Sequence, residues 1–124
     1  MGKRALIVED NDILQLIEKT FLEESGLTVD CADSGETALS LIETCRYDLI
    51  LMDLGLPGID GIETAKKIKA YESAHNLLSA PIVAVTGNAD EANKSLCLAA
   101  GMSETIEKPL KSEQAIFLVK KYLH

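Results

Sequence analysis

The stretch that decides the fold is Leu49-Ile50-Leu51-Met52-Asp53, in which four consecutive apolar residues end on a carboxylate. A short, continuously apolar run of this kind is typical of a strand that is covered on both faces, as strands of a parallel sheet are. The turn-forming segment 55–58 comes next, and apolar residues then recur at helical spacing through Ile62, Ala65 and Ile68. This order of strand, turn and helix predicts a β–α unit.

The same order recurs along the rest of the chain. Apolar runs at 5–8, 27–31, 81–85 and 105–106 predict four further strands, and helical spacing follows each of them. We expect Ser34 and Ser112 to cap the helices that they precede. The residues expected to form apolar stripes are Ile13, Leu16, Ile17 and Phe21 in the first helix, Ala38, Leu41, Ile42 and Cys45 in the second, and the buried positions Ile116, Val119 and Leu123 in the last. Five β–α units in a row predict an α/β fold with a parallel sheet.

Length and composition exclude several classes of protein. The chain has 124 residues, of which 47% are hydrophobic, and a formal net charge of −8. This length fits one domain, expected to be residues 1–124, with a real core. The acidic balance disfavours a nucleic-acid surface, and no apolar run approaches the roughly 18 residues of a membrane span. Three cysteines without a C-x-x-C pair fit a reducing compartment, so we expect a cytoplasmic domain.

Polar side chains follow four of the five predicted strands. Glu9 and Asp10 come after the first strand, Asp53 ends the third, Thr86 ends the fourth, and Lys108 follows the last. Ligands of open parallel sheets bind beyond the carboxyl ends of the strands, so these side chains are expected to converge. Taken singly, each has an ordinary explanation, such as an acid that caps the next helix, a role open to Asp10 or Asp12. Taken together, they place three carboxylates at one edge, which is unfavourable unless a cation is bound.

The convergent set has the chemistry of a phosphoryl-transfer site. Hard, anionic oxygen ligands suit Mg²⁺, which is bound through one or two carboxylates and keeps several waters. The metal and Lys108 would neutralise charge on the phosphoryl oxygens, and Thr86 would donate a hydrogen bond to one of them. Asp53 would then be the in-line nucleophile, and the product would be an aspartyl phosphate.

Spaced segments of the chain resemble the receiver domain of two-component response regulators, over residues 3–124. The matching segments are Leu6–Asn11, Leu49–Asp53, Leu56–Gly61, Pro81–Thr86, Ala100–Met102 and Lys108-Pro109. Matches in this order along the whole chain are far more specific than any single motif. The resemblance implies a flavodoxin-like three-layer sandwich, (βα)5, whose five-stranded parallel sheet has the order 2-1-3-4-5.

The resemblance also implies a role for each site residue. Asp53 would accept a phosphoryl group from a phosphohistidine, and Lys108 would contact that group, with a cis bond to Pro109. Thr86 would be the hydroxyl that moves toward the phosphate. The residues implied as Mg²⁺ ligands are Asp10 and Asp53 directly, Gly55 through its backbone carbonyl, and Glu9 through water.

One residue, Thr105, departs from the family pattern, and two others are expected to affect how long the phosphate lasts. The family usually has Tyr or Phe three residues before the lysine, where this chain has Thr105. This difference affects how the signal leaves through the last strand and helix, and does not affect phosphoryl acceptance. Gly55 has no side chain to orient a hydrolytic water, so we expect Gly55 and Asn88 to influence the lifetime of the phosphate.

The implied partners are a sensor histidine kinase, a histidine-phosphotransfer domain, or both. The docking surface would be the first helix near Ile13 and Leu14, beside the site. The region around Cys97 and 100–102 slightly favours a receiver of the hybrid-kinase type over a stand-alone regulator. The domain itself is expected to be a monomer or a weak, phosphorylation-dependent dimer, without nucleic-acid or membrane contacts.

Other functions fit the residues less well. A haloacid-dehalogenase-type phosphatase also uses a strand-end Asp, Mg²⁺, a hydroxyl and a Lys, but it needs a general acid two residues after the nucleophile, where this chain has Gly55. A nucleotide-binding module would need a glycine-rich phosphate loop, and neither G-x-G-x-x-G nor G-x-x-x-x-G-K-[ST] occurs. A degenerate, docking-only receiver would lack site residues, and none is missing. The domain is therefore predicted to be a phosphoacceptor that assists only its own phosphorylation and dephosphorylation, rather than a substrate-turning enzyme.

Overall fold

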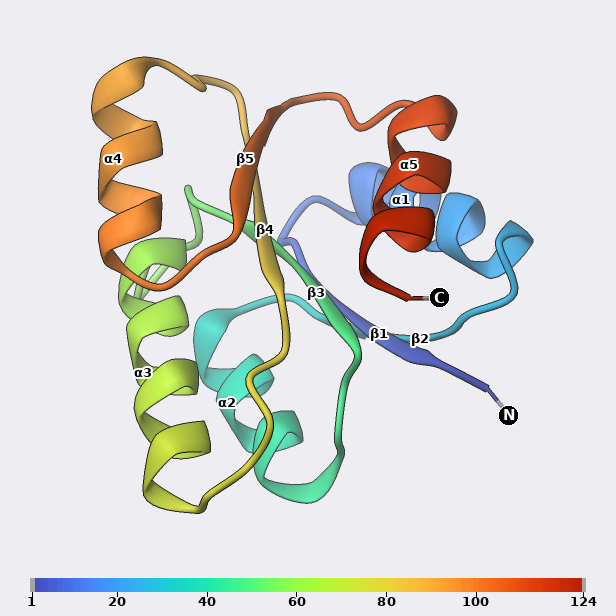
Figure 1. Ribbon diagram of the computed structural model, residues 1–124. Helices are drawn as coiled ribbons and strands as arrows, with labels where there is room; N and C mark the ends of the chain where they lie inside the picture. The colour runs from blue at the N-terminus through green and yellow to red at the C-terminus, as the bar shows by residue number, and fades with distance from the viewer. Residues whose placement is uncertain (1, 124) are drawn as a thin grey trace.

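The structure is a computed structural model that describes residues 2–123, and it contains one parallel sheet between two layers of helices (Figure 1). Met1 and His124, the outermost residues of the expected domain, lie outside the described residues. In chain order the elements are β1 (Arg4–Val8), α1 (Asp12–Glu24), β2 (Thr28–Ala32), α2 (Gly35–Thr44), β3 (Leu49–Asp53), α3 (Gly61–Ala74), β4 (Ile82–Thr86), α4 (Glu91–Ala99), β5 (Glu104–Glu107) and α5 (Ser112–Tyr122).

The strand order is β2-β1-β3-β4-β5, with every pair parallel, which confirms the predicted 2-1-3-4-5 sheet. β3 and β4 are buried along their whole length, and β1 is buried from Ala5 onward. This burial on both faces explains why these strands are continuously apolar rather than alternating. The register pairs Val8 with Met52 and Asp53 with Val85, so the carboxyl ends of the three central strands lie level with one another.

The helices divide into two groups, one on each face of the sheet. α1 and α5 pack together on one face, and α2, α3 and α4 cover the other (Figure 1). Each face has its own apolar core, in which Leu22 and Leu118 represent the α1/α5 side and Ile42 and Ile68 represent the opposite side. The sheet residues alternate between these two cores, which is why five short strands suffice to organise both.

Two expectations about the last helix are wrong. Lys111, rather than Ser112, is the N-cap residue, and its backbone N–H donates to Gln114 Oε1 over 2.8 Å, so that Ser112 becomes the first helical residue. Ile116, expected to be buried, is 48% exposed, whereas Ala115 and Leu118 are buried. Consecutive helical residues point about 100° apart, and the small Ala115 is the residue that faces the sheet.

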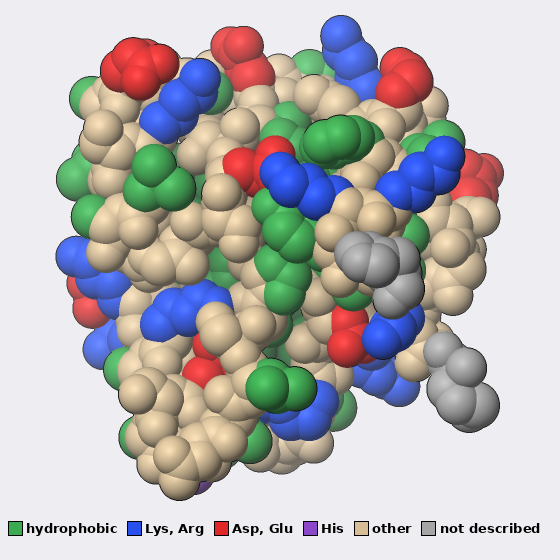
Figure 2. Space-filling model, viewed as in Figure 1, with side chains coloured by type: hydrophobic (Ala, Val, Ile, Leu, Met, Phe, Trp, Pro, Cys, Tyr) green, Lys and Arg blue, Asp and Glu red, His purple; other side chains and the backbone are tan. Residues whose placement is uncertain are grey.

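The first helix presents its apolar stripe mostly outward. Ile13 and Leu16 are 70% and 64% exposed, while Leu22 and a carboxylate, Glu18, are buried beneath the helix. Over the face seen in Figure 2, basic, acidic and hydrophobic side chains are intermixed. Among residues 2–123 there is no helix that is both long and apolar enough to cross a membrane.

The packing of α5 can be tested with two matched truncations. Leu118→Ala should lower the free energy of unfolding by about 2–5 kcal/mol, because it leaves a cavity at a fully buried position. Ile116→Ala, two residues earlier, should lower it by less than about 1 kcal/mol, because about half of that side chain already contacts solvent. Urea unfolding of both variants measures the difference, and a larger loss for Ile116→Ala than for Leu118→Ala would show that the helix packs in the register expected from the sequence.

Candidate functional site

The carboxyl edge of the sheet brings three acidic residues together. Glu9 and Asp10 directly follow β1, and Asp53 is the last residue of β3. One carboxylate oxygen from each lies within 4.8 Å of the others. Glu9 is only 1% exposed and Asp53 only 5%, whereas Asp10 is exposed to solvent. The convergence expected from the strand ends is therefore present, with two buried carboxylates behind one exposed carboxylate.

Lys108 bridges the two buried carboxylates. Its Nζ lies 3.1 Å from Glu9 Oε1 and 3.0 Å from Asp53 Oδ1. Burial by itself would lower the pKa of Lys108, but the hydrogen bonds and charges of Asp53 and Glu9 outweigh it and raise the pKa above its usual value. Lys108 consequently carries its charge in this site. Its bond to Pro109 is cis, as the resemblance implies.

Glu9 is positioned by hydrogen bonds from the residues that follow it in the chain. Its Oε2 accepts the Asn11 N–H over 3.0 Å, and its backbone carbonyl accepts Gln15 Nε2 over 2.9 Å. Burial is the main cause that raises the pKa of Glu9, and the Asn11 N–H and Lys108 oppose it. The N-cap of α1 is Asn11, whose Oδ1 accepts the Leu14 N–H over 3.0 Å, and not Asp10 or Asp12. Asp10 is thus not used as a cap.

Asp53 is positioned by the turn that follows β3. Its Oδ1 accepts the Gly55 N–H over 3.1 Å in addition to the contact with Lys108. The chain then turns back so closely that a Cβ on Gly61 would lie 2.2 Å from the Asp53 carbonyl oxygen. A glycine at the start of α3 is therefore what lets the helix approach the end of β3. Within residues 2–123, the two polar contacts of the Asp53 side chain, with Lys108 Nζ and the Gly55 N–H, both involve Oδ1.

Thr86 connects the ends of β4 and β5. Its backbone carbonyl accepts the Lys108 N–H over 2.7 Å, and its Oγ1 accepts the Asn88 N–H over 3.2 Å. The register places Thr86 one residue beyond Val85, the partner of Asp53. The hydroxyl is buried at the same edge of the sheet as the carboxylates. All the side chains predicted from the strand ends are thus at one edge.

Thr105 lies away from this cluster, in β5, paired with Ala84. It helps to line a groove of about 290 Å³ between α4 and β5, whose other lining residues are Lys94, Leu98, Ser103 and Glu104. A larger side chain at residue 105 would occupy part of this groove. The position at which the family usually has an aromatic residue is therefore half-buried beside an unfilled groove.

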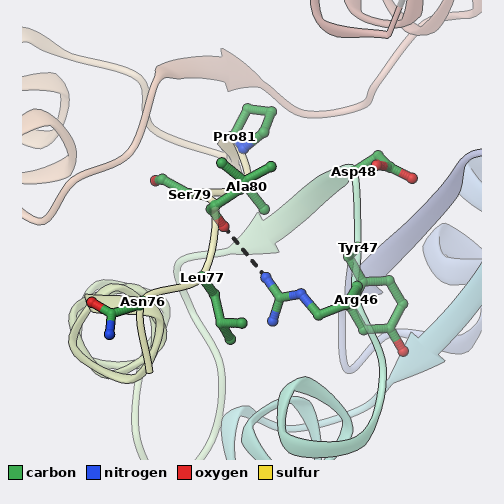
Figure 3. A pocket seen from close by; sticks show the side chains of 9 residues that line it. Arg46, Tyr47, Asp48, Asn76, Leu77, Ser79, Ala80 and Pro81 are labelled. Carbon is green, nitrogen blue, oxygen red and sulfur yellow. Dashed lines mark hydrogen bonds between the residues drawn. The ribbon is translucent and has the colours of Figure 1, made fainter. Parts of the chain in front are cut away.

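A wider groove lies at the opposite end of the sheet (Figure 3). It measures about 500 Å³ and is lined by the α2–β3 loop around Tyr47 and the α3–β4 loop, residues 76–81. Arg46 reaches across it and donates to the Leu78 carbonyl over 3.3 Å. It contains none of the polar residues that follow the carboxyl ends of the strands.

Sequence reasoning missed two polar residues of α1 that interact with the site. Gln15 contacts the Glu9 backbone and lies in the first turns of α1 without any motif to mark it. Glu18 is 3% exposed, and no pattern in the sequence predicts a buried carboxylate in this helix. Burial is the main cause that raises the pKa of Glu18 to about 7, and the charges of Glu9 and Asp53 add to the effect, while Lys108 opposes it.

The raised pKa of Glu18 predicts a loss of stability with rising pH. Between about 4.5, its ordinary pKa, and about 7 the folded protein keeps a proton that the unfolded chain has lost, so deprotonation favours unfolding. At pH 8 the Glu18→Gln variant should exceed the wild type in free energy of unfolding by about 2–3 kcal/mol, and at pH 5 by much less. Urea unfolding at both pH values measures this difference.

Glu23→Gln is the matched control, because Glu23 lies on the exposed side of the same helix. It should change the free energy of unfolding by less than about 0.5 kcal/mol at either pH. A gain for Glu18→Gln of the same size at pH 5 and pH 8 would contradict the buried, titrating carboxylate.

Comparison with known proteins identifies what this arrangement is similar to. The family model described as the response regulator receiver domain matches residues 5–120. The chain is 38% identical over 94% of its length to the hybrid signal transduction histidine kinase M of Dictyostelium discoideum, covering 5% of that protein. It is 35% identical over 96% of its length to the sensor protein GacS of Pseudomonas syringae pv. syringae, covering 13%.

A solved structure gives the same result in three dimensions. The receiver domain of the Saccharomyces cerevisiae response regulator Ssk1, crystallised with the histidine phosphotransfer protein Ypd1, superposes with a TM-score of 0.87 at 31% identity, over 98% of this chain and 86% of that one. The chain spans only 5–16% of the length of the first curated relatives that it matches.

Proposed function

Because this chain belongs to the response regulator receiver domain family of two-component and phosphorelay signalling, we propose that Asp53 is its phosphoacceptor. The observation that carries the proposal is the environment of this carboxylate. Asp53 is buried at the end of a central strand, 3.0 Å from Lys108 and beside Glu9 and Asp10. No single structural role requires two acids and a lysine to be gathered around a third acid at a sheet edge.

The acidic group fits Mg²⁺. Its donors are hard carboxylate oxygens from Glu9, Asp10 and Asp53, which lie within 4.8 Å of one another, and the buried Glu9 Oε1 is paired with Lys108 Nζ at 3.1 Å. Asp10 and Asp53 would hold the ion, together with the Gly55 carbonyl, and Glu9 would act through water. When bound, Mg²⁺ neutralises negative charge on the phosphoryl oxygens.

The proposed reaction moves one phosphoryl group from a phosphohistidine to Asp53. An Asp53 carboxylate oxygen forms the new O–P bond, the P–N bond of the donor breaks, and the imidazole nitrogen leaves with the electron pair. Lys108 and the Gly55 N–H already contact Oδ1, so Oδ2 is the proposed nucleophile. Lys108 and the Thr86 hydroxyl would stabilise the charge of the transferred group.

The exposed apolar stripe of α1 supports docking of the phosphodonor protein. Ile13, Leu16 and Ile17 are exposed, and α1 begins three residues after Glu9. A partner that covers this stripe would bring its phosphohistidine to the acidic edge. We propose a sensor histidine kinase or a histidine-phosphotransfer domain as this partner, and the match to hybrid kinases supports a receiver of that type.

Two features bear on the alternatives and on location. Gly55 stands where a haloacid-dehalogenase-type phosphatase would need its general acid, so we propose a phosphoacceptor that turns over no separate substrate. The three cysteines are free thiols, which supports a cytoplasmic location for this domain, proposed as residues 1–124.

Intact-mass measurement after incubation with acetyl phosphate tests the proposed function. The wild type should gain one phosphoryl group when Mg²⁺ is present and none when it is chelated. Asp53→Asn should gain none, because an amide is not a nucleophile here. Asp60→Asn is the matched control, since Asp60 is an exposed N-cap residue of α3 outside the acidic group. Asp60→Asn should be phosphorylated like the wild type.

Two outcomes would count against the proposal. Equal phosphorylation of Asp53→Asn would place the acceptor elsewhere. No mass gain in the wild type, with Mg²⁺ binding shown separately by titration, would favour a domain that serves only for docking.

A further inference from the structure

The connection between β4 and α4 is organised around one residue, Asn88. Its backbone carbonyl accepts Asn93 Nδ2 over 2.7 Å, and its side-chain Oδ1 accepts the Asp90 N–H over 3.3 Å. Its own N–H donates to Thr86 Oγ1 over 3.2 Å. These contacts link the first turn of α4 to the buried hydroxyl at the end of β4. The hydrogen bond from Asn93 is the shortest of the three.

The side chain of Asn93 has no part in capping its own helix. The N-cap of α4 is Asp90, whose Oδ1 accepts the backbone N–H of Asn93 over 2.9 Å. The Asn93 amide group instead reaches back over the loop to Asn88. Asparagine is among the weaker helix formers, so its presence inside a helix is a local disadvantage that calls for another reason.

This linkage determines how the Thr86 hydroxyl can be used. A hydroxyl oxygen that accepts one N–H still has its own proton to donate. The Asn88 N–H occupies one lone pair of Thr86 Oγ1. The Lys108 N–H holds the Thr86 backbone carbonyl in place. The position of Asn88 therefore decides where the remaining proton of Thr86 can point.

We propose that Asn93 is a positioning residue for phosphoryl transfer, acting through Asn88 to orient the Thr86 hydroxyl toward the group on Asp53. The inference rests on the proposed function. It concerns a residue of α4 that is neither a strand-end residue nor a member of the acidic group. The hydroxyl donates to a phosphoryl oxygen, and the Asn93 amide keeps the loop in the conformation that presents it.

Asn93→Asp tests this role with the smallest change of shape. The carboxylate keeps the size of the side chain but cannot donate to the Asn88 carbonyl, and a negative charge in the first helical turn is favourable for α4. We expect the rate of Mg²⁺-dependent phosphorylation of Asp53 by acetyl phosphate to fall roughly threefold to tenfold, as for one lost hydrogen bond. Asn93→Ala should lower the rate in the same way without adding charge.

Ala92→Asp is the matched control, because Ala92 is an exposed neighbour in the same turn and the substitution adds the same charge. Its rate should stay within about twofold of the wild type. Thermal unfolding midpoints of all three variants should remain close to that of the wild type, which separates positioning from loss of fold.

A double-mutant cycle with Thr86→Ala shows whether Asn93 acts through the hydroxyl. Once the hydroxyl is gone, Asn93→Asp should have no further effect on the rate. An equal fall in both backgrounds, or an unchanged or raised rate in the wild-type background, would overturn the role of Asn93. Absence of any phosphorylation in the wild type would instead refute the proposed function itself, so the two failures are distinguishable.

Discussion

The arrangement of this edge of the sheet depends on one cation between two buried carboxylates. Lys108 comes from the segment after β5, Glu9 follows β1, and Asp53 ends β3, so one ammonium group joins distant parts of the chain. Burying a carboxylate is unfavourable unless a cation accompanies it, and Lys108 accompanies both of these acids. One ammonium group does not balance three carboxylates, so the cluster keeps an excess of negative charge, which favours binding of a divalent cation. The contacts of Lys108 therefore matter both for the fold and for the chemistry of the site.

The backbone around the cluster depends on particular residues at the starts of two helices. Gly61 allows α3 to begin directly against the Asp53 carbonyl, because it has no side chain. Asn11 caps the start of α1, two residues after Glu9. Each helix thus starts at the point where a strand delivers its polar residue. Because both groups of helices are packed on opposite faces of the sheet, a shift of either group would move one of these anchors.

Strand-end chemistry was predictable from the sequence because it depends only on chain order and on the parallel direction of the strands. Asp53, Thr86 and Lys108 needed no side-chain packing to be placed at one edge. Packing details were not predictable in this way. Ile116 is exposed because the smaller Ala115 faces the sheet, and Glu18 is buried despite its charge. The burial of these residues depends on how α1 and α5 pack against each other, and the spacing of apolar residues does not predict that packing.

Thr105 bears on how the Thr86 hydroxyl is connected to the rest of the domain. In a receiver with an aromatic residue there, movement of the hydroxyl is matched by movement of a ring on β5. A threonine cannot fill the groove between α4 and β5, so it has no bulky group to exchange. One connection between Thr86 and a helix runs through Asn88 to Asn93, in the first turn of α4. In this chain, hydrogen bonds through Asn88 connect the Thr86 hydroxyl to the first turn of α4, and residue 105 offers no aromatic side chain.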